Sequence, residues 1–409
     1  MPKVIPCMEE TVFEVEGGIM KLLDACELIV DCPHSTAKDE GSGYPLIRTP
    51  NVGRGRLKLD GVHRVSYETY CARNERAVPQ TDDLILAREA PVGNVAIIKE
   101  GQQVCLGQRT VLIRPNKNIV EPDFLVYYLL SPEMQHILLS SANGATVSHL
   151  NMADIRKLEI SLPDLEVQKK IGSLLSAIED KIETNNEIND NLEQQAEAYF
   201  NHLFIANADP SWPEGTISDI GTVVGGSTPS KAKPEYYTDN GIAWITPKDL
   251  SVDKSKFISH GADDITELGL KNSSASIMPT GTVLFSSRAP IGYIAIADGE
   301  VTTNQGFKSV VPNSNVGTAF VYYFLKNALP TIENMASGST FKEISGSAMR
   351  TVPAIIPDDE NLQKFTNFCE PLFQQQRTLE AENRFLTSLR DTLLPKLMSG
   401  ELDISDIDI

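Results

Sequence analysis

Basic side chains suited to binding nucleic acid gather in one short segment of the chain. Between positions 43 and 76, seven Arg and Lys residues stand against three acids. Arginine can donate two hydrogen bonds to guanine in the major groove, whereas lysine mostly contacts phosphates. The alternative for each residue is a charged position on a solvated loop. The candidates for DNA contact in this half of the chain are Lys38, Arg48, Arg54, Arg56, Lys58, Arg64 and Arg73.

The charge of the whole chain argues against DNA binding by this chain alone. Its formal net charge is −19 at pH 7, and a protein that neutralises phosphates unaided needs an excess of Lys and Arg. The acids are concentrated elsewhere, between Glu159 and Glu197 and in the tail ELDISDIDI. An acidic chain with one basic surface fits a subunit whose partners supply part of the DNA affinity.

No group of residues predicts catalysis or a metal site. The six cysteines include no CxxC pair, which favours free buried thiols, and the six histidines show no HxxxH or HExxH spacing. The stretch GGSTPSK lacks the GxxxxGK[ST] spacing of a phosphate-binding loop. An NPPY or DPPY tetrapeptide, with which an adenine methyltransferase would hold a flipped base, does not occur. We therefore expect no catalytic residue, no metal and no cofactor on this chain.

The chain contains one unit twice. ILAREAPVGNVAII from Ile85 returns as LFSSRAPIGYIAIA from Leu284, and LVYYLL from Leu125 returns as FVYYFL from Phe320. Four further landmarks recur in the same order, at an offset that stays between 194 and 199 residues, so the two halves should share a fold. The other pairs are GYPLIRTPNV with GIAWITPKDL, GQRTVLIRP with NQGFKSVVP, NGATVSHL with SGSTFKEI, and KLEISLP with TVPAIIP.

Each copy begins with a mixed α/β body. Short β-branched runs between Gly, Pro and Asn residues predict strands, and apolar side chains at helical spacing predict a helical segment in each copy. The tyrosines of the LVYYLL and FVYYFL pair, Tyr127, Tyr128, Tyr322 and Tyr323, fit core positions. The predicted strands include 95–98, 111–113, 242–246 and 294–297, and the predicted helical segments are 122–140 and 317–336.

Polar residues of the second copy are candidates for the same DNA contacts. GGSTPSK opens this copy as DCPHSTA opens the first. Arg88 and Arg288 stand beside the repeated Ala-Pro turns, where they could approach a DNA backbone or stabilise the turn. The candidates in the second copy are Ser230, Lys231, Lys233, Tyr236, Lys248 and Arg288, and Arg88 joins those of the first.

A long amphipathic helix follows each body. Its apolar positions step by four and three residues, which is the heptad pattern of a coiled coil, and each seam becomes polar near its middle. The first seam is Ile171, Leu175, Ile178, Ile182, Asn185, Asn189 and Leu192. The second is Phe365, Phe368, Leu372, Gln375, Leu379, Leu386, Leu389 and Leu393, with Glu382 in its polar middle.

The two helices are predicted to run antiparallel. A helix from Glu166 to Leu203 would be roughly 57 Å long, whereas the connector of about 12 residues reaches at most about 43 Å. A parallel arrangement would require the connector to return the chain over the full helix length. The antiparallel arrangement also lets the polar middles of the seams hydrogen-bond to each other, and it predicts one body at each end of a rod.

Two related bodies on a stiff spacer are suited to reading duplex DNA at two places. Successive major grooves on one face of DNA recur every ~34–36 Å. Because the two bodies differ in sequence, the two half-sites should differ as well. The prediction is an asymmetric target in two parts.

The chain resembles specificity subunits of Type I restriction–modification systems. The resemblance rests on the doubled layout, on GGSTPSK and DCPHSTA, on the REAPVG and RAPIG turns, and on the ending LRDTLLPKLMSGEL, and it extends from about residue 19. It implies two target recognition domains, with the helices as spacer and as docking surface for two methyltransferase subunits that use S-adenosylmethionine. Restriction and translocase subunits that use ATP and Mg would join them, and these cofactors are expected only on the partners.

The predicted organisation is a pseudo-two-fold α/β (α+β) repeat in the cytoplasm, because no signal peptide or membrane-spanning run is recognisable. One alternative is a coiled-coil scaffold for protein assembly that reads no DNA, and another is an enzyme. The predicted parts are an extension (1–18), a first recognition domain (19–163), a central helix (164–205), a second recognition domain (206–357), a C-terminal helix (358–400) and an acidic tail (401–409).

Overall fold

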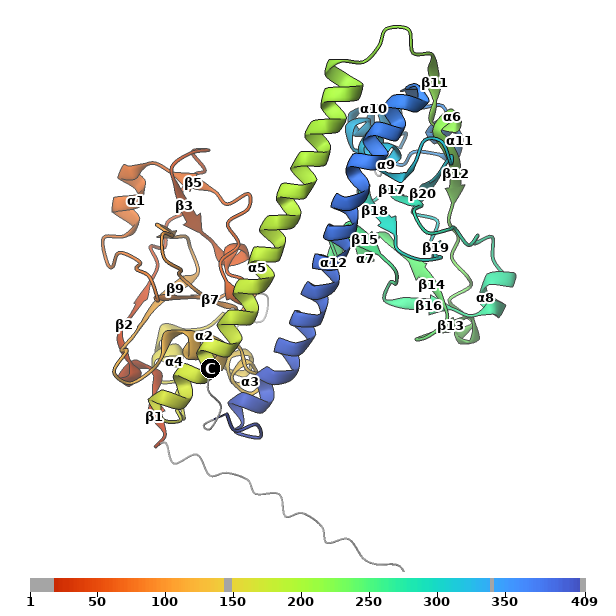
Figure 1. Ribbon diagram of the computed structural model, residues 1–409. Coiled ribbons are helices and arrows are strands. Elements are labelled where there is room, and N and C mark those ends of the chain that lie inside the picture. The colour runs from red at the N-terminus through yellow and green to blue at the C-terminus, as the bar shows by residue number, and fades with distance from the viewer. Residues whose placement is uncertain (1–17, 143–148, 339–341, 405–409) are drawn as a thin grey trace, which may run out of the picture. The chain divides into compact units, whose positions relative to one another are not determined.

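The structure, a computed structural model, describes residues 18–142, 149–338 and 342–404 (Figure 1). The predicted extension up to residue 17, the end of the acidic tail and part of the NGATVSHL and SGSTFKEI pair lie outside the described residues. The chain divides into two compact units, Met1–Glu183 with Arg384–Ile409, and Thr184–Asn383. We call residues 18–163 the first head and residues 206–357 the second head.

The first head is built on a five-stranded sheet of order β2-β9-β6-β7-β4. Neighbouring strands are antiparallel except β4, which runs parallel to β7. A smaller sheet has the order β5-β3-β8, and β1 pairs with β10. The strands are β1 (Met20–Lys21), β2 (Cys26–Asp31), β3 (Tyr44–Ile47), β4 (Gly55–Arg56), β5 (Arg64–Val65), β6 (Leu84–Ala87), β7 (Val95–Ile97), β8 (Cys105–Leu106), β9 (Thr110–Pro115) and β10 (Glu159–Ile160).

The second head repeats this topology. Its five-stranded sheet has the order β12-β20-β17-β18-β15, again with the edge strand β15 parallel to its neighbour. Its smaller sheet has the order β13-β16-β14-β19, and β11 pairs with β21. The strands are β11 (Glu214–Thr216), β12 (Gly221–Gly225), β13 (Tyr237–Thr238), β14 (Ile242–Ile245), β15 (Phe257–Ile258), β16 (Asp263–Ile265), β17 (Val283–Ser287), β18 (Ile291–Ala297), β19 (Thr302–Thr303), β20 (Lys308–Pro312) and β21 (Pro353–Ile355).

The matching strand orders confirm the internal repeat, and even the register is shared. Leu84 pairs with Ile97 in the first head, and Val283 pairs with Ile296 in the second. In both heads the edge strand that runs parallel to its neighbour meets this same position, because Arg56 pairs with Ile97 and Phe257 pairs with Ile296. The main sheets of the two heads therefore have the same strand order and the same register at these positions.

Each main sheet separates two small cores. Because side chains alternate between the two faces of a strand, Leu84 and Leu86 face the helices while Ile85 and Ala87 face the smaller sheet. In the second head Val283 and Leu284 divide in the same way. This two-sided burial explains why the strands read as unbroken apolar runs in the sequence.

The helical segment predicted in each head is two helices. In the first head a proline ends the first helix, since Pro132 cannot continue it and Ser131 caps the next. In the second head the first helix ends at Asn327, and after Ala328 the second helix begins with Leu329 and Pro330. The helices are α1 (Tyr67–Arg73), α2 (Pro122–Leu130), α3 (Pro132–Ser141), α4 (Met152–Arg156), α6 (Ile217–Ile220), α7 (Pro247–Val252), α8 (Glu267–Lys271), α9 (Thr318–Asn327), α10 (Leu329–Met335) and α11 (Gly346–Arg350).

Two long helices, α5 (Leu165–Asn201) and α12 (Asp359–Met398), pack against each other and contribute to both units. In the second unit Asn185 contacts Glu382, and further along α5 the rings of Tyr199 and Phe365 lie 6.0 Å apart. Partner numbers fall along α12 as they rise along α5, so the predicted antiparallel direction is confirmed. Within the described ranges, no helix is both long enough and apolar enough to cross a bilayer.

The polar middles of the two seams meet. Asn185 is fully buried, and its Nδ2 donates to Oε2 of Glu382 at 2.8 Å. Gln375 is exposed, however, and its neighbour Gln376 is buried in its place and donates to the carbonyl of Asn189 at 3.2 Å. The expected polar contact therefore forms as predicted at Glu382, whereas at Gln375 it is shifted by one residue to Gln376.

The buried face of each long helix is wider than a coiled-coil seam, because each helix also packs against a head. On α12 this face includes Leu362, Cys369 and Phe373, which pack against the second head. Of the predicted apolar seam, Phe368 is exposed, and Ile182, Leu372, Leu386, Leu389 and Leu393 are half-buried. Its buried members are Ile171, Leu175, Ile178, Leu192, Phe365 and Leu379.

Candidate nucleic-acid interface

A closed loop in the first head presents two of the predicted cations to solvent. Asn51, at the end of a 3₁₀ turn (Thr49–Asn51), is buried and accepts from the amide of Lys58 through its carbonyl at 2.8 Å. Its side-chain Nδ2 donates back to the carbonyl of Lys58 at 3.2 Å. The two bonds close the loop between these residues, and the side chains of Arg54 and Lys58 lie exposed on it.

The other predicted cations of the first head vary in exposure. Lys38 and Arg64 are exposed, and Nη1 of Arg64 donates to the carbonyl of Gly43 at 2.8 Å. Arg48 is half-buried. Its amide donates to Oδ1 of Asn51 at 3.2 Å, so it stands at the start of the same loop.

Two residues predicted to contact DNA, Arg73 and Arg88, form hydrogen bonds and ion pairs within the first head. Arg73 is buried, and its guanidinium donates to the carbonyls of Ser35 at 2.9 Å and Pro33 at 3.2 Å. Arg88 is half-buried, with Nη1 at 2.8 Å from Oδ1 of Asp31 and Nε at 2.7 Å from the carbonyl of Leu150. These bonds point both guanidinium groups toward the protein, so the structure favours an internal role for Arg73 and Arg88 over a DNA contact.

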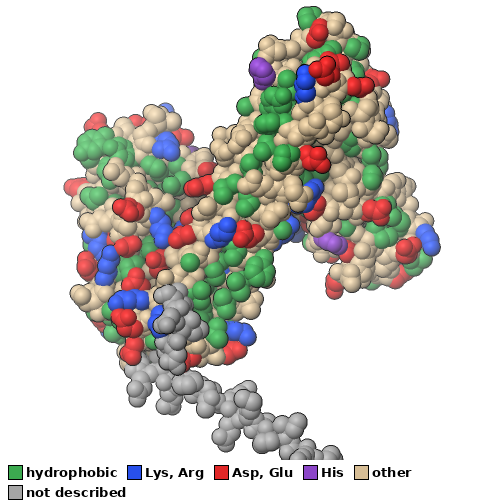
Figure 2. All heavy atoms as spheres, viewed as in Figure 1, with side chains coloured by type: hydrophobic (Ala, Val, Ile, Leu, Met, Phe, Trp, Pro, Cys, Tyr) green, Lys and Arg blue, Asp and Glu red, His purple; other side chains and the backbone are tan. Residues whose placement is uncertain are grey.

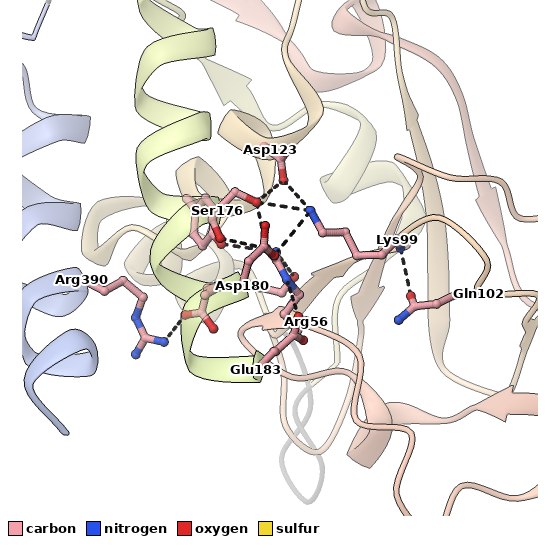
Figure 3. Close-up of polar contacts among 11 residues, drawn as sticks. Arg56, Lys99, Gln102, Asp123, Ser176, Asp180, Glu183 and Arg390 are labelled. Carbon is pink, nitrogen blue, oxygen red and sulfur yellow. Dashed lines mark hydrogen bonds and ion pairs between the residues drawn. The ribbon is translucent and has the colours of Figure 1, made fainter. Parts of the chain in front are cut away.

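Arg56 is also turned inward, toward the long helix. Only 7% of it is exposed, and its Nη2 donates to Oδ1 of Asp180 at 2.7 Å and to Oγ of Ser176 at 2.8 Å (Figure 3). Nη1 donates to the hydroxyl of Tyr127 at 3.3 Å. Burial raises the pKa of the Tyr127 hydroxyl, which therefore stays protonated. Arg56 joins the head to α5 and does not face solvent.

In the second head the loop after β12 carries exposed polar residues on a braced backbone. Nε1 of Trp244 donates to the carbonyl of Ser227 at 3.0 Å. The hydroxyl of Tyr237 donates to the carbonyl of Pro229 at 2.6 Å. The hydrogen bond from Lys233 to the hydroxyl of Tyr236 raises the pKa of the Lys233 ammonium, which therefore stays charged. The exposed candidates of this head are Ser230, Lys231, Lys233 and Lys248.

Two candidates of the second head are less available. Tyr236 is 4% exposed and forms part of the core. Arg288 is half-buried, and its Nη1 lies 3.5 Å from Oε2 of Glu343. As for Arg88, the turn-stabilising alternative fits these contacts better than an approach to DNA.

An aromatic surface of the first head was missed by the sequence reasoning. The rings of Tyr44 and Tyr70 lie 4.3 Å apart, and the ring of Tyr67 lies 5.9 Å from that of Tyr44. Tyr67 is 66% exposed, beside the strand that carries Arg64. The signal in the sequence is the SYETY spacing, which places Tyr67 and Tyr70 on one face of a helix.

Charges of both signs are mixed on the visible surface of the molecule. In the view of Figure 2, Lys and Arg side chains of the first head lie among acidic ones and form no continuous basic patch on that face. Several exposed cations also have acidic partners, such as Lys117, whose Nζ lies 2.6 Å from Oδ2 of Asp82. This mixture fits a protein whose DNA affinity comes partly from other subunits.

In the second unit, a buried lysine connects the second head to both long helices. Lys256 pairs with Glu193 of α5, and its Nζ donates to Oε1 of Gln376 on α12 at 2.7 Å. Lys326 adds a second ammonium, 2.6 Å from Oε1 of Glu193. Burial of Glu193 opposes its ionisation, but the two ammoniums outweigh this effect and lower the pKa of its carboxyl.

We predict that Glu193→Gln lowers the free energy of unfolding by about 3 kcal/mol at pH 7, because it leaves a buried ammonium without its acid. A lowered pKa in the folded state means that the contribution is complete above the ordinary glutamate pKa of about 4.3 and is lost as the pH falls further. Urea unfolding between pH 7 and pH 3 measures this difference.

Glu197→Gln is the matched control for this prediction. Glu197 contacts the same Lys326 at 3.3 Å, but its side chain is 47% exposed, so the loss should stay below about 1 kcal/mol. A difference between wild type and Glu193→Gln that stays constant down to pH 3 would contradict the assignment.

Comparison with known proteins shows where this chain belongs. A family model described as "Type I restriction modification DNA specificity domain" matches residues 18–194 and 210–384. The MjaIX specificity subunit of Methanocaldococcus jannaschii is 42% identical over 170 residues, which cover 41% of this chain and 39% of that subunit. The HindI specificity subunit of Haemophilus influenzae is 25% identical over 369 residues, which cover 71% of this chain and 80% of that subunit.

A solved structure shares the fold. The crystal structure of a Type I restriction–modification S subunit from M. genitalium superposes with a TM-score of 0.60 over 94% of this chain and 96% of that one, at 18% identity. Each segment matched by the family model covers one head, the second from residue 210 on, and most of the helix that follows it. The chain therefore belongs to the family of Type I restriction modification DNA specificity domains and is the DNA specificity subunit of such a system, its non-catalytic subunit.

Proposed function

We propose that the two heads read the two different parts of one bipartite, asymmetric DNA target. The observation that carries this proposal is the pair of heads with equal strand order and unequal exposed side chains. The loop after β2 in the first head and the loop after β12 in the second occupy equivalent positions but have different sequences. Equal frameworks with different surface loops are the arrangement expected of two readers with different specificities.

The proposed contacts are the exposed members of the sequence-based set, with Arg48 at the edge of the loop that it starts. Arginine would contact guanine or phosphate, and lysine and serine would mostly contact phosphate. The exposed ring of Tyr67 adds an apolar surface beside Arg64. In the first head the set is Lys38, Arg48, Arg54, Lys58, Arg64 and Tyr67, and in the second it is Ser230, Lys231, Lys233 and Lys248.

We propose further that α5 and α12 dock two methyltransferase subunits, which bind S-adenosylmethionine, and that restriction and translocase subunits join this complex. Family membership supports an assembly of this kind. Exposed aromatic side chains on α12 support it as well, since Phe385 is 65% exposed and Phe368 is 36% exposed. The separation of the two heads stays a prediction.

Mapping of methylated adenines by single-molecule sequencing tests this function. Cells that carry the partner subunits should show one motif of two unequal parts with a fixed gap when this gene is present. The motif should vanish when the gene is removed. A motif that persists without the gene, or that has one continuous part, would refute the proposal.

A further inference from the structure

The contact between the first head and α5 is built from buried and partly buried charges. Besides Arg56, Lys99 lies between two acids, with Nζ 3.6 Å from Oδ1 of Asp123 and 3.9 Å from Oδ1 of Asp180. Ser176 donates to Asp123 at 2.9 Å, and it accepts from Lys99 at 3.3 Å (Figure 3). The network therefore joins β4, the end of β7, the start of α2 and the middle of α5.

We propose that Arg56 and Asp180 are positioning residues, which fix the orientation of the first head on α5 and thereby set the gap between half-sites that the subunit accepts. This inference rests on the proposed function. It assigns a role in specificity to residues that do not touch DNA.

The chain path gives the contact this role. Arg56 stands two residues after Arg54 and two before Lys58, within the loop that presents both cations to solvent. A displacement of the Arg56 guanidinium relative to α5 therefore moves the proposed reading loop by a similar amount. Next to it, Gly55 has a φ of +101°, and a Cβ there would lie 3.3 Å from the Tyr127 ring, so the backbone is held against α2.

The network continues to the second long helix. Glu179, the neighbour of Asp180 in the sequence, is buried and pairs with Arg390 of α12. Two consecutive acids of α5 thus bind in opposite directions: Asp180 binds Arg56 of the head, and Glu179 binds Arg390 of α12. These contacts hold the first head in one orientation on the pair of long helices. A fixed gap between half-sites requires such a fixed orientation.

The second unit has the same type of contact at the equivalent edge strand. Lys256 directly precedes β15, the counterpart of β4, and it reaches Glu193 of α5 and Gln376 of α12. Its own amide donates to Oε1 of Glu380 on α12 at 2.8 Å. In both units, then, a buried cation at the parallel edge strand joins the head to an acid of a long helix, with different residues doing so.

The test measures gap preference separately from stability. Arg56→Met and Asp180→Asn complexes with the partner subunits would be assayed for adenine methylation on DNA whose half-sites are separated by the native gap or by one base pair more or less. We expect the preference for the native gap to fall by about 10- to 100-fold, because a misplacement of about 1 Å can cost up to about 100-fold in rate. Asp180 is 54% exposed, so its neutral variant should fold even if Arg56→Met does not.

Arg114→Met is the control that keeps the positions of head and helix. Arg114 forms a two-bond pair with Asp83 inside the first head, at 2.8 Å for each bond, and Asp83 is 2% exposed. This variant should lower the melting temperature but retain the native gap preference, and Arg56→Lys should recover part of the preference lost in Arg56→Met.

Two results separate the possible failures. If Asp180→Asn and Arg56→Met keep the wild-type gap preference while this chain still directs methylation to a two-part site, the positioning role is refuted and the proposed function stands. If wild-type complexes methylate adenine without regard to this chain, the proposed function itself fails.

Discussion

Replacing Arg54 and Lys58 together by alanine is expected to weaken specific DNA binding of the assembled complex about 10- to 100-fold at ~0.15 M salt. Each side chain is exposed on the closed loop of the first head, and Nη2 of Arg54 also donates to the carbonyl of Leu130 at 3.2 Å. The loss of both side chains removes two proposed contacts to phosphate or base without opening the core. Two lost phosphate contacts should also lower the slope of log affinity against log salt by nearly 2. Titration of the complex with its target DNA at several salt concentrations measures both quantities.

Lys117→Ala is the control for this loss of charge. Lys117 is exposed but follows β9 on the way to α2 and pairs with Asp82. Its removal changes the net charge without touching a proposed contact, so affinity should change by less than about threefold, as for a surface substitution of ±0.5 kcal/mol. Equal losses in the double variant and this control would remove Arg54 and Lys58 from the interface.

Gly226→Ala is expected to destabilise the second unit by about 3 kcal/mol or more and to abolish methylation of the native target. A Cβ at this position would lie 2.0 Å from the carbonyl oxygen of Asn304 and 2.4 Å from that of Thr303. Both are backbone atoms beside β19, and the amide of Ser227 donates to the Thr303 carbonyl at 2.8 Å. The backbone of the second head must therefore move apart, at the cost of an overpacked core.

The neighbouring glycine provides the control. A Cβ on Gly225 would have no heavy atom within 4 Å, so Gly225→Ala should change stability by less than about 0.5 kcal/mol. Thermal unfolding should show a fall in melting temperature of about 6–12 °C for Gly226→Ala and almost none for Gly225→Ala. Equal melting temperatures would contradict the packing described for this loop.

The repeat made most of the fold predictable from the sequence. Six collinear landmarks required two equal bodies, and the heptad runs required long helices after each body. The reach of the connector between residues 204 and 215 then required the helices to run in opposite directions. These arguments succeed because they depend on chain length and periodicity, which are properties of the sequence itself.

The inward or outward direction of single cations was not predictable in the same way. Arg54, Arg56 and Lys58 alternate in one Gly-rich stretch, and nothing local distinguishes the middle one. Only the approach of α5, more than 100 positions later in the sequence, provides Asp180 and Ser176 as partners for Arg56. Likewise, Arg73 is on a short helix whose buried side depends on the loop at Pro33.

The shifted seam of α12 has a related cause. The heptad pattern assumes that the helix packs against one partner helix, and on this assumption it predicts that Phe368 and Gln375 face that partner. This part of the helix packs against both α5 and the second head, so its buried positions move to Cys369 and Gln376. Sequence periodicity identifies a buried stripe but not how many surfaces share it.

Exchange of one head is the measurement that tests the central claim most directly. The second head, residues 206–357, would be replaced by the corresponding segment of another specificity subunit with a known target, and methylated adenines would be mapped. If each head reads its own half-site, one half of the target changes to that of the donor while the other half stays the same. A chimaera that folds and methylates DNA with both halves altered, or with neither altered, would contradict the account.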